Sequence, residues 1–288
     1  MSMEQEMFTT STGLITRKHE GAEFWDQNPC GGVWPTYREF MTWIQNTEPY
    51  VFSVLKNINW NGKRVVEVGC GQGTTLNFLP QFGAEIFGLD MSHQSILSAQ
   101  FGASELGQTD RTRFLQADAE RLPLQSGSFD IAISIGVLHH TADTAEGVRE
   151  IHRLLKPGGL AVVMLYRSGN PKWWMTRLLR AYSKLVDLVN SRSYVLANRI
   201  RTRQSSGAAE GTALLELFGV PILKAFSNSQ SRKLFSDFGE IRIRNYQPGF
   251  LRLADILPAL SPLKKLLASL DRQTENSWGF YQVIEARK

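Results

Sequence analysis

The chain has 288 residues, of which 42% are hydrophobic and 20% charged, and its formal net charge is +5. These apolar side chains are enough for a packed core, so the composition excludes a disordered or fibrous protein. Cys30 and Cys70 lie far apart without metal-ligand spacing, which argues against a disulfide framework and a zinc site. We therefore expect no metal and a reducing, cytoplasmic setting.

Neither a signal segment nor a membrane span is expected. The first residues, MSMEQEMFTTSTG, lack a basic and then apolar pattern, and no stretch approaches the roughly 18 apolar residues of a spanning helix. The protein is expected to be soluble and at most peripheral to a membrane.

Segment 1–60 is expected to form a helical lid before the core. It contains the stretch GAEFWDQNPCGGVWPTYREF and then a helical pattern from Tyr37 to Lys56. Aromatic faces attract cations, so the stretch would suit a lid over a cationic ligand, but packing of aromatic side chains in a core is the favoured interpretation. The residues concerned are Trp25, Asn28, Cys30, Trp34 and Tyr37.

A glycine-rich turn follows the first predicted strand. The β-branched run in residues 65–68 predicts a buried strand, and GCGQG at 69–73 predicts a turn whose backbone a ligand can approach. A helix from Thr74 to Phe82 and a second buried strand from Glu85 to Asp90 should follow. The acidic end of that strand, Asp90, can accept hydrogen bonds from two ribose hydroxyls.

The glycine spacing distinguishes between cofactors. Gly69, Gly71 and Gly73 are spaced G-x-G-x-G, whereas nicotinamide-dependent oxidoreductases use G-x-G-x-x-G. Glu67 would repel a pyrophosphate and suits a cationic ligand better. This turn therefore opposes an oxidoreductase.

The pattern acidic-x-G-x-G-x-G resembles the first motif of the class I S-adenosylmethionine-dependent methyltransferases. Three later segments, Phe114–Pro123, Phe129–His140 and Leu154–Leu165, resemble that family's further motifs in the same order. The resemblance implies an α/β fold with a Rossmann-like, seven-stranded, mostly parallel sheet and helices on both faces. It implies S-adenosylmethionine as cofactor and S-adenosylhomocysteine as product.

The resemblance also assigns cofactor-binding roles. The loop from Glu67 to Gly73 would hold the methionine portion, Asp90 the ribose, and Asp118 the exocyclic amine of adenine. The full predicted set is Glu67, Gly69, Cys70, Gly71, Gly73, Asp90, Met91, Asp118, Ala119 and Ile135.

Two histidines, His139 and His140, follow the fourth predicted strand, at the edge where ligands bind in open α/β sheets. One would serve as a general base or orient an acceptor, because imidazole titrates near neutral pH. A structural role in lining the cofactor pocket is equally well supported. With Tyr37, they are the candidate catalytic residues.

The predicted core spans 61–167 and 237–288, and a helical cap at 168–236 interrupts it. Helical insertions are thus expected after the fifth and sixth strands. The elements expected from Thr144 onward are a helix Thr144–Leu155, an amphipathic cap helix Lys172–Asn190, a strand Glu240–Tyr246, a helical insertion Phe250–Leu270 and a strand Trp278–Ala286.

Positive charge is concentrated in the cap. Residues 167–203 contain nine Lys or Arg and one acid, a formal +8, so the remainder of the chain is about −3 (23 basic minus 26 acidic residues). Arg177, Arg180 and Lys184 would meet an anionic membrane surface or an anionic substrate, although an ordinary packed helix with a solvated charged face is favoured. A nucleic-acid partner is not expected. Both a monomer and a homodimer are compatible with the sequence.

These features predict methyl transfer from S-adenosylmethionine to a small-molecule acceptor by in-line displacement. The apolar, basic cap favours a lipophilic or amphiphilic acceptor, such as a secondary metabolite, a quinone or a lipid-like compound. The alternatives are a methyltransferase acting on a protein or nucleic acid, and a non-catalytic module that binds the cofactor. The usual Asn-Pro-Pro-aromatic acceptor motif is absent, because residues 134–137 read SIGV.

Overall fold

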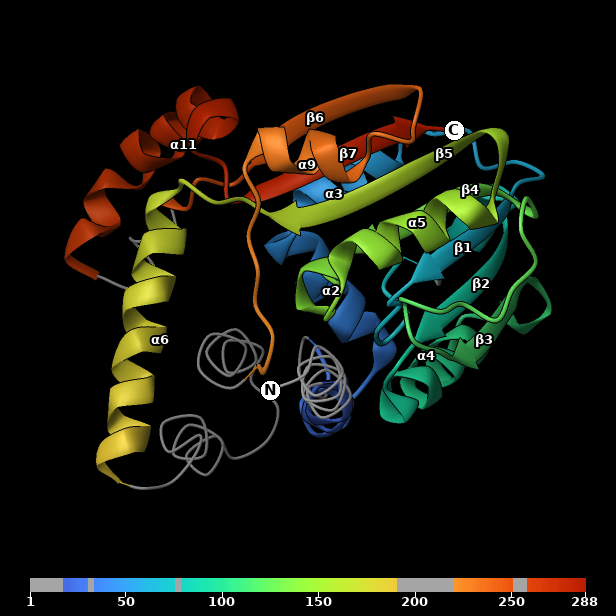
Figure 1. The fold of residues 1–288 in the computed structure, drawn as a ribbon, viewed down its shortest axis with the longest axis horizontal. Helices are drawn as coiled ribbons and strands as arrows, with labels where there is room; N and C mark the ends of the chain where they lie inside the picture. Colours follow the sequence, from blue (N-terminus) through green and yellow to red (C-terminus); the bar gives the residue numbers. More distant parts are fainter. Residues whose placement is uncertain (1–17, 31–33, 76–78, 191–219, 251–257) are drawn as a thin grey trace, which may run out of the picture.

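The structure is a computed structural model that describes residues 18–30, 34–75, 79–190, 220–250 and 258–288. Seven strands in these ranges form a sheet in the order β3-β2-β1-β4-β5-β7-β6 (Figure 1). The first five strands pair in parallel, and β7 runs antiparallel between β5 and β6. The predicted Rossmann-like, mostly parallel sheet is confirmed. The strands are β1 (Arg64–Val68), β2 (Glu85–Asp90), β3 (Thr112–Gln116), β4 (Phe129–Ile135), β5 (Leu155–Tyr166), β6 (Glu240–Tyr246) and β7 (Tyr281–Arg287).

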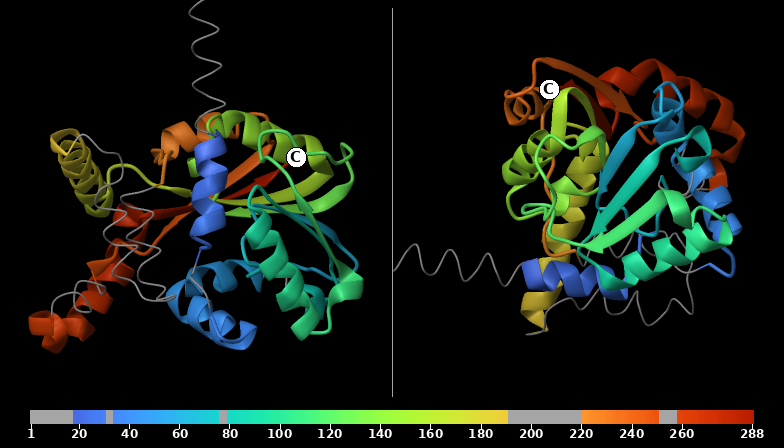
Figure 2. Two further views of the ribbon diagram at one scale, coloured as in Figure 1. Left: turned by 90° about the horizontal axis from the view of Figure 1, so that it is seen from below. Right: turned by 90° about the vertical axis from the view of Figure 1, so that its right-hand side faces the viewer.

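Helices cover both faces of this sheet (Figures 1 and 2). On one face, α3 (Pro49–Leu55) and α4 (His93–Glu105) contribute Leu55 and Ile96 to a core with the central strands. On the other face, α5 (Thr144–Leu154) and the end of α9 (Asn228–Leu234) bring Ile151 and Phe235 into a second core. The central strands are apolar on both sides because both of their faces are buried.

The helix predicted from Tyr37 to Lys56 is wrong as one element. The structure has two helices, α2 (Tyr37–Thr47) and α3, which meet at Glu48. Glu48 has φ −126° and ψ 53°, outside the helical region. Proline disfavours the helical conformation in the residue before it and lacks a backbone N–H, so Pro49 ends one helix and begins the next.

The helix predicted from Thr74 to Phe82 is also wrong where the structure describes it. Thr74 and Thr75 belong to a turn, and only η1 (Leu79–Phe82), a 3₁₀ helix, follows. Residues 76–78 of the prediction lie outside the described residues. Pro80 lacks a backbone N–H and so cannot donate an α-helical hydrogen bond.

The second predicted insertion, Phe250–Leu270, contains η4 (Pro258–Leu263) and the start of α11 (Lys264–Trp278), while residues 251–257 lie outside the described part of the chain. The helix continues to Trp278, where the last strand was expected to begin. Gly279 follows it as the C-cap residue with a ψ of 137°, and only glycine fits there because a Cβ would lie 2.5 Å from both the Glu275 carbonyl oxygen and the Tyr246 nitrogen.

The predicted cap helix is α6 (Pro171–Val189), while residues 191–219 of the predicted cap lie outside the described residues. Asn170 caps α6 by accepting from the Lys172 N–H at 2.6 Å, and its side-chain amide donates to the Trp278 carbonyl. Arg167 donates to the Ser277 carbonyl at 2.5 Å. The beginning of α6 is therefore tied to the end of α11, and both helices project from the same side of the sheet (Figure 2).

Candidate functional site

The glycine-rich loop lies at the carboxyl end of β1. Gly69, Gly71 and Gly73 have φ values of +75°, +52° and +85°, a region that side chains rarely adopt. The backbone nitrogens of Gly69 and Cys70 donate to the Leu89 carbonyl at 2.6 and 2.9 Å. These bonds hold the loop against the end of β2.

Two glycines of this loop have different surroundings. A Cβ on Gly69 would lie 2.2 Å from a methyl carbon of Val137, so this glycine permits close packing against the segment after β4. A Cβ on Gly71 would have nothing within 4 Å. Gly71 therefore leaves an open cradle that any side chain would begin to fill.

Asp90, at the end of β2, fixes the loop. Its two carboxylate oxygens accept from the Gly71 N–H and the Ser92 N–H, each at 2.9 Å. Burial raises the pKa of Asp90 despite these bonds. Each oxygen retains a further lone pair, so the carboxylate can still accept from a ligand hydroxyl.

Glu67 is buried beneath the loop, with 3% of its surface exposed. Its Oε2 atom has no hydrogen-bond partner among the described residues. Burial raises its pKa to about 8; the nearby Thr75 hydroxyl opposes this rise, and the negative charge of Asp90 adds to it. A buried carboxyl oxygen without a partner is costly, so this position favours a cationic or hydrogen-bond-donating ligand.

A helical segment, residues 18–27, contacts the loops that follow β2 and β3. The Lys18 ammonium forms ion pairs with Asp118 at 2.8 Å and Glu120 at 2.6 Å. Asp26 accepts from the Ser92 hydroxyl at 2.7 Å. The predicted adenine-binding carboxylate is thus already paired with an ammonium of this segment.

His139 and His140 lie in η3 (Leu138–His140), directly after β4. His139 is fully buried, and neither ring nitrogen has a hydrogen-bond partner among the described residues. Burial holds its pKa well below the usual range, and His140 adds to the effect, so the ring is neutral at pH 7. Its centroid lies 3.8 Å from that of Tyr166, whereas Nδ1 of His140 is 2.8 Å from the Ile222 carbonyl oxygen.

Tyr37 supports the glycine loop. Its hydroxyl donates to the Gly73 carbonyl at 2.6 Å, and its ring packs against Gly102, where a Cβ would lie 2.4 Å from a ring carbon. The contact with Gly73 gives Tyr37 a positioning role. A catalytic role for its hydroxyl stays a prediction.

The aromatic residues predicted to form a lid are divided among separate contacts. The Trp25 ring meets His140 with centroids 5.3 Å apart, and Trp34 packs on Trp43 at 5.7 Å. Asn28 donates to the Phe24 carbonyl at the end of its own helical segment. Cys30 is exposed, and its carbonyl accepts from Gln72 at 2.6 Å.

The other predicted cofactor residues lie at the same carboxyl edge of the sheet. Burial raises the pKa of the Cys70 thiol well above its usual range, so this cysteine stays neutral. Met91, Ala119 and Ile135 are half-buried at or just beyond the ends of β2, β3 and β4. The cofactor residues predicted from the sequence therefore all lie at the carboxyl edge of the sheet. The sequence did not indicate Lys18, Asp26 or Glu120, because isolated charges carry no motif.

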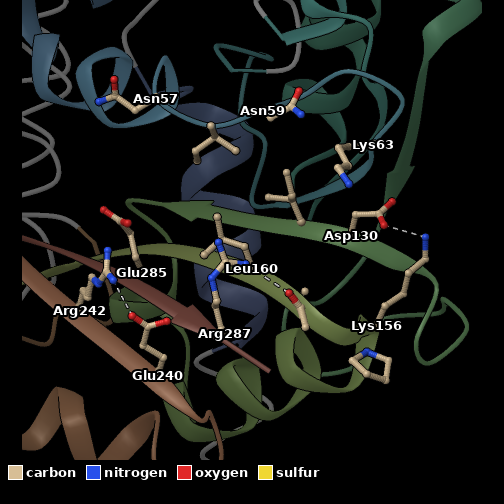
Figure 3. Close-up of a pocket in the computed structure, with 15 residues that line it drawn as sticks. Asn57, Asn59, Lys63, Asp130, Lys156, Leu160, Glu240, Arg242, Glu285 and Arg287 are labelled. Carbon is tan, nitrogen blue, oxygen red and sulfur yellow. Dashed lines mark hydrogen bonds and ion pairs between the residues drawn. The ribbon is translucent and has the colours of Figure 1, made fainter.

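A hollow of about 550 Å³ lies at the opposite, amino edge of the parallel strands (Figure 3). Its lysine and arginine side chains are partly neutralised, since Lys156 pairs with Asp130 at 2.9 Å and Arg242 with Glu240 at 2.7 Å. Ligands of open α/β sheets bind beyond the carboxyl ends of the strands. The glycine loop is therefore the better candidate site.

Residues 66–163 match a family model described as "Methyltransferase domain". Within these residues the chain is a methyltransferase domain, of the class I S-adenosylmethionine-dependent type that its motifs resemble. S-adenosylmethionine is accordingly the cofactor that this domain implies. The match runs from β1 to β5 and includes the glycine loop, Asp90, Asp118 and His139, whereas Lys18, Asp26 and Tyr37 lie before it.

Curated relatives resemble this methyltransferase domain in sequence. A ubiquinone biosynthesis O-methyltransferase of Pseudomonas aeruginosa (strain LESB58) is 34% identical over 122 residues, which cover 42% of this chain and 51% of the relative. Another, from Sodalis glossinidius, is 30% identical over 155 residues, covering 54% of this chain and 61% of the relative. The chain spans about half the length of the curated relatives it matches.

Solved structures share the fold. An S-adenosylmethionine-dependent methyltransferase from Mesorhizobium loti has a TM-score of 0.52 at 18% identity, covering 83% of this chain and 96% of that one. A complex of the Haloferax volcanii Trm112 activator with a methyltransferase gives 0.58 at 17% identity, covering 92% and 97%. The cyclase SpnF gives 0.54 at 18% identity, covering 93% and 94%. At these identities the likeness shows the fold alone, and fold does not determine reaction.

The buried Glu67 predicts a gain in stability when its charge is removed. The pKa of about 8 in the folded protein exceeds the ordinary 4.5, so the folded state binds the proton more tightly. Stability is therefore lost as pH rises from 4.5 to 8. We expect Glu67→Gln to raise the free energy of unfolding at pH 8 by about 2–4 kcal/mol, with little difference near pH 4.5.

Thermal denaturation at both pH values measures this difference. The matched control is Glu20→Gln, an exposed glutamate on the helical segment 18–27. An equal or lower melting temperature of Glu67→Gln at pH 8 would contradict the assigned burial cost.

Proposed function

We propose that this chain transfers a methyl group from S-adenosylmethionine to a hydroxyl of a small, lipophilic molecule. The observation that carries the proposal is the unpartnered, buried Oε2 of Glu67 beside the open cradle at Gly71. S-adenosylmethionine carries an ammonium and a sulfonium, and both positive groups suit a site that contains Glu67 and Asp90. The names of the curated relatives support oxygen as the acceptor atom and a quinone-like acceptor class.

Each proposed cofactor residue binds a different part of S-adenosylmethionine. Glu67 accepts from the ammonium of the methionine portion, and the backbone at Gly71 approaches the ligand because no side chain intervenes. Asp90 accepts from the ribose hydroxyls through the lone pairs that the Gly71 and Ser92 N–H groups leave unused. Asp118 accepts from the adenine amine once Lys18 has moved away.

His139 is the proposed general base. Its nitrogens have no hydrogen-bond partner among the described residues, so one of them is open to take the proton of an acceptor hydroxyl that reaches the buried ring. Burial lowers its pKa and so makes it a weaker base than an exposed histidine. The oxygen then attacks the methyl carbon, and the bonding pair of the breaking C–S bond stays on sulfur. The cofactor supplies the electrophilic methyl group. The chain contributes the alignment of the two reactants and the acceptance of the proton.

Gly71→Ala should separate cofactor binding from folding. The added methyl group occupies the cradle, so we expect binding of S-adenosylhomocysteine to weaken at least tenfold in calorimetry. The control is Gly62→Ala, which lies before β1 at the amino edge. Gly62 has a similar φ of +68° and, like Gly71, nothing within 4 Å of an added Cβ.

Both alanine variants should lose about 1–2 kcal/mol of stability, because each places a side chain in the left-handed region. Only Gly71→Ala should lose affinity. Parent-like affinity in Gly71→Ala would disprove the loop as the cofactor site.

Lys18→Met should strengthen cofactor binding. The ammonium of Lys18 pairs with Asp118, and both side chains are about one-third exposed, so this ion pair is weak. Its removal frees Asp118 for the adenine amine, and we expect a two- to fivefold tighter dissociation constant for S-adenosylhomocysteine. Lys56→Met, at an exposed position after α3, controls for loss of positive charge. Weaker binding in Lys18→Met would mean that Lys18 assists the ligand.

The reaction is tested with methyl-labelled S-adenosylmethionine and a whole-cell metabolite extract, partitioned into organic and aqueous phases. With the cofactor below saturation, we expect label in the organic phase with the parent protein and at least tenfold less with Gly71→Ala. Label confined to the aqueous phase would contradict a lipophilic acceptor. Tight cofactor binding without transfer would indicate a non-catalytic module.

The role of His139 is tested with the acceptor found in this way. His139→Gln should lower kcat by about 100-fold. The rate of the variant should rise with pH, because the acceptor hydroxyl must then ionise unaided. A parent-like rate and pH profile would leave His139 as a structural residue.

A further inference from the structure

Helix α6 exposes more of its apolar side chains than an ordinary surface helix does. Its two buried residues are polar, Thr176 and Ser183, with 7% and 4% of their surface exposed, and the apolar Trp173, Leu179 and Val186 on the same side are only half-buried. Arg180, on the same side, donates to the Val220 carbonyl at 3.0 Å. A surface helix normally packs its apolar face inward. More than half of the surface is exposed at each of seven apolar residues: Trp174, Met175, Leu178, Tyr182, Leu185, Leu188 and Val189.

These apolar residues form a continuous stripe. Trp174, Leu178, Tyr182, Leu185 and Val189 follow one another at intervals of four, four, three and four residues, the spacing of one helix face. Large apolar patches on a protein surface mark interaction sites. We refer to these five residues as the α6 stripe.

Positive charge borders the stripe. Arg177 and Lys184 are both exposed and lie seven residues, or two turns, apart on the same flank. The Arg177 guanidinium lies 5.1 Å from the centroid of the Trp174 ring. The acid of this helix, Asp187, is half-buried and falls on the polar side by helical spacing. The water-facing part of α6 is therefore apolar and cationic.

Helix α11 carries the same combination at its beginning. Lys264 and Lys265 are exposed, and Leu266 is 56% exposed. Figure 2 shows α6 and α11 extending from the same side of the sheet. Exposed apolar and basic residues thus occur on both projecting helices.

The charge favours a lipid surface over a second copy of the chain. Helix α6 carries four Lys or Arg residues and one Asp, a formal +3, so two copies that met through this helix would repel each other. An anionic bilayer attracts this face, and tryptophan and tyrosine are typical of the membrane interface. No described helix is long and apolar enough to cross a membrane. Within the described residues, α6 therefore suits a position along the interface.

We propose that α6 docks on the surface of an anionic phospholipid bilayer. The α6 stripe enters the boundary between headgroups and acyl chains, and Arg177 and Lys184 contact lipid phosphates. The docking brings the methyltransferase domain to the phase in which a lipophilic acceptor dissolves. This last consequence rests on the proposed function, whereas the binding itself does not.

Vesicle flotation with the full chain tests the docking. The two probes are vesicles of phosphatidylcholine alone and vesicles with phosphatidylglycerol in equal part. The apolar variant is Leu178→Gln with Leu185→Gln, and the charge variant is Arg177→Gln with Lys184→Gln. The matched control is Leu97→Gln with Phe101→Gln, two exposed apolar residues one turn apart on α4.

The parent and the α4 control should bind the anionic vesicles and leave the neutral ones unbound. The apolar variant should bind at least tenfold more weakly, and the charge variant roughly tenfold to thirtyfold more weakly at low salt. Parent-like binding by both α6 variants, or no binding by the parent, would overturn the proposal. So would concentration-dependent self-association in sedimentation that the apolar variant abolishes, because the stripe would then belong to a second copy.

Calorimetry with S-adenosylhomocysteine separates this proposal from the proposed function. Each α6 variant should bind the ligand as the parent does, because α6 lies outside the glycine loop. Failure of every protein to bind S-adenosylhomocysteine would defeat the proposed function and leave the vesicle result standing.

Discussion

One half-buried carboxylate, that of Asp90, joins the segments that make the site. Its oxygens accept from Gly71 in the glycine loop and from Ser92 at the start of α4. Ser92 in turn donates to Asp26, which belongs to the helical segment 18–27. The loop, the helix beginning and the N-terminal segment are thus connected through the end of β2. A change in the hydrogen bonds of Asp90 would be transmitted to all three.

In the site, one group has an incomplete set of hydrogen bonds and another holds a partner that a ligand would have to replace. Glu67 bears the cost of burial without a partner for Oε2, and Asp118 holds an ammonium supplied by the chain itself. Residues kept for ligand binding commonly reduce the stability of the free protein. The two carboxylates differ in their effect on ligand binding. A ligand that donates to Glu67 removes part of its burial cost, whereas a ligand that binds Asp118 must first displace the Lys18 ammonium. Affinity is the balance of these opposing contributions.

The sequence predicted best where a local pattern and its tertiary surroundings agree. The bounds of β2 and β6 agree with their predictions, and the three glycines needed no long-range information to be placed in a turn. The break at Glu48 was overlooked because the apolar periodicity continues across Pro49. For α6, periodicity predicted the helix and its stripe, but it does not tell which face meets the protein. Lys18 was missed because its contact with Asp118 joins residues 100 positions apart.

The position of β7 has a consequence for how the chain folds. Tyr281–Arg287 is the last strand in sequence, yet it lies between β5 and β6 and pairs with both. In the native sheet, β6 pairs only with β7, so it has no partner strand until β7 inserts. More than a hundred residues lie between β5 and β7, and pairing these two strands closes a loop of that length. Such distant pairings form slowly, because the entropy of loop closure is lost before the contacts are gained. During synthesis, the parallel half of the sheet can assemble early, while β5 exposes an unpaired edge until β7 has left the ribosome.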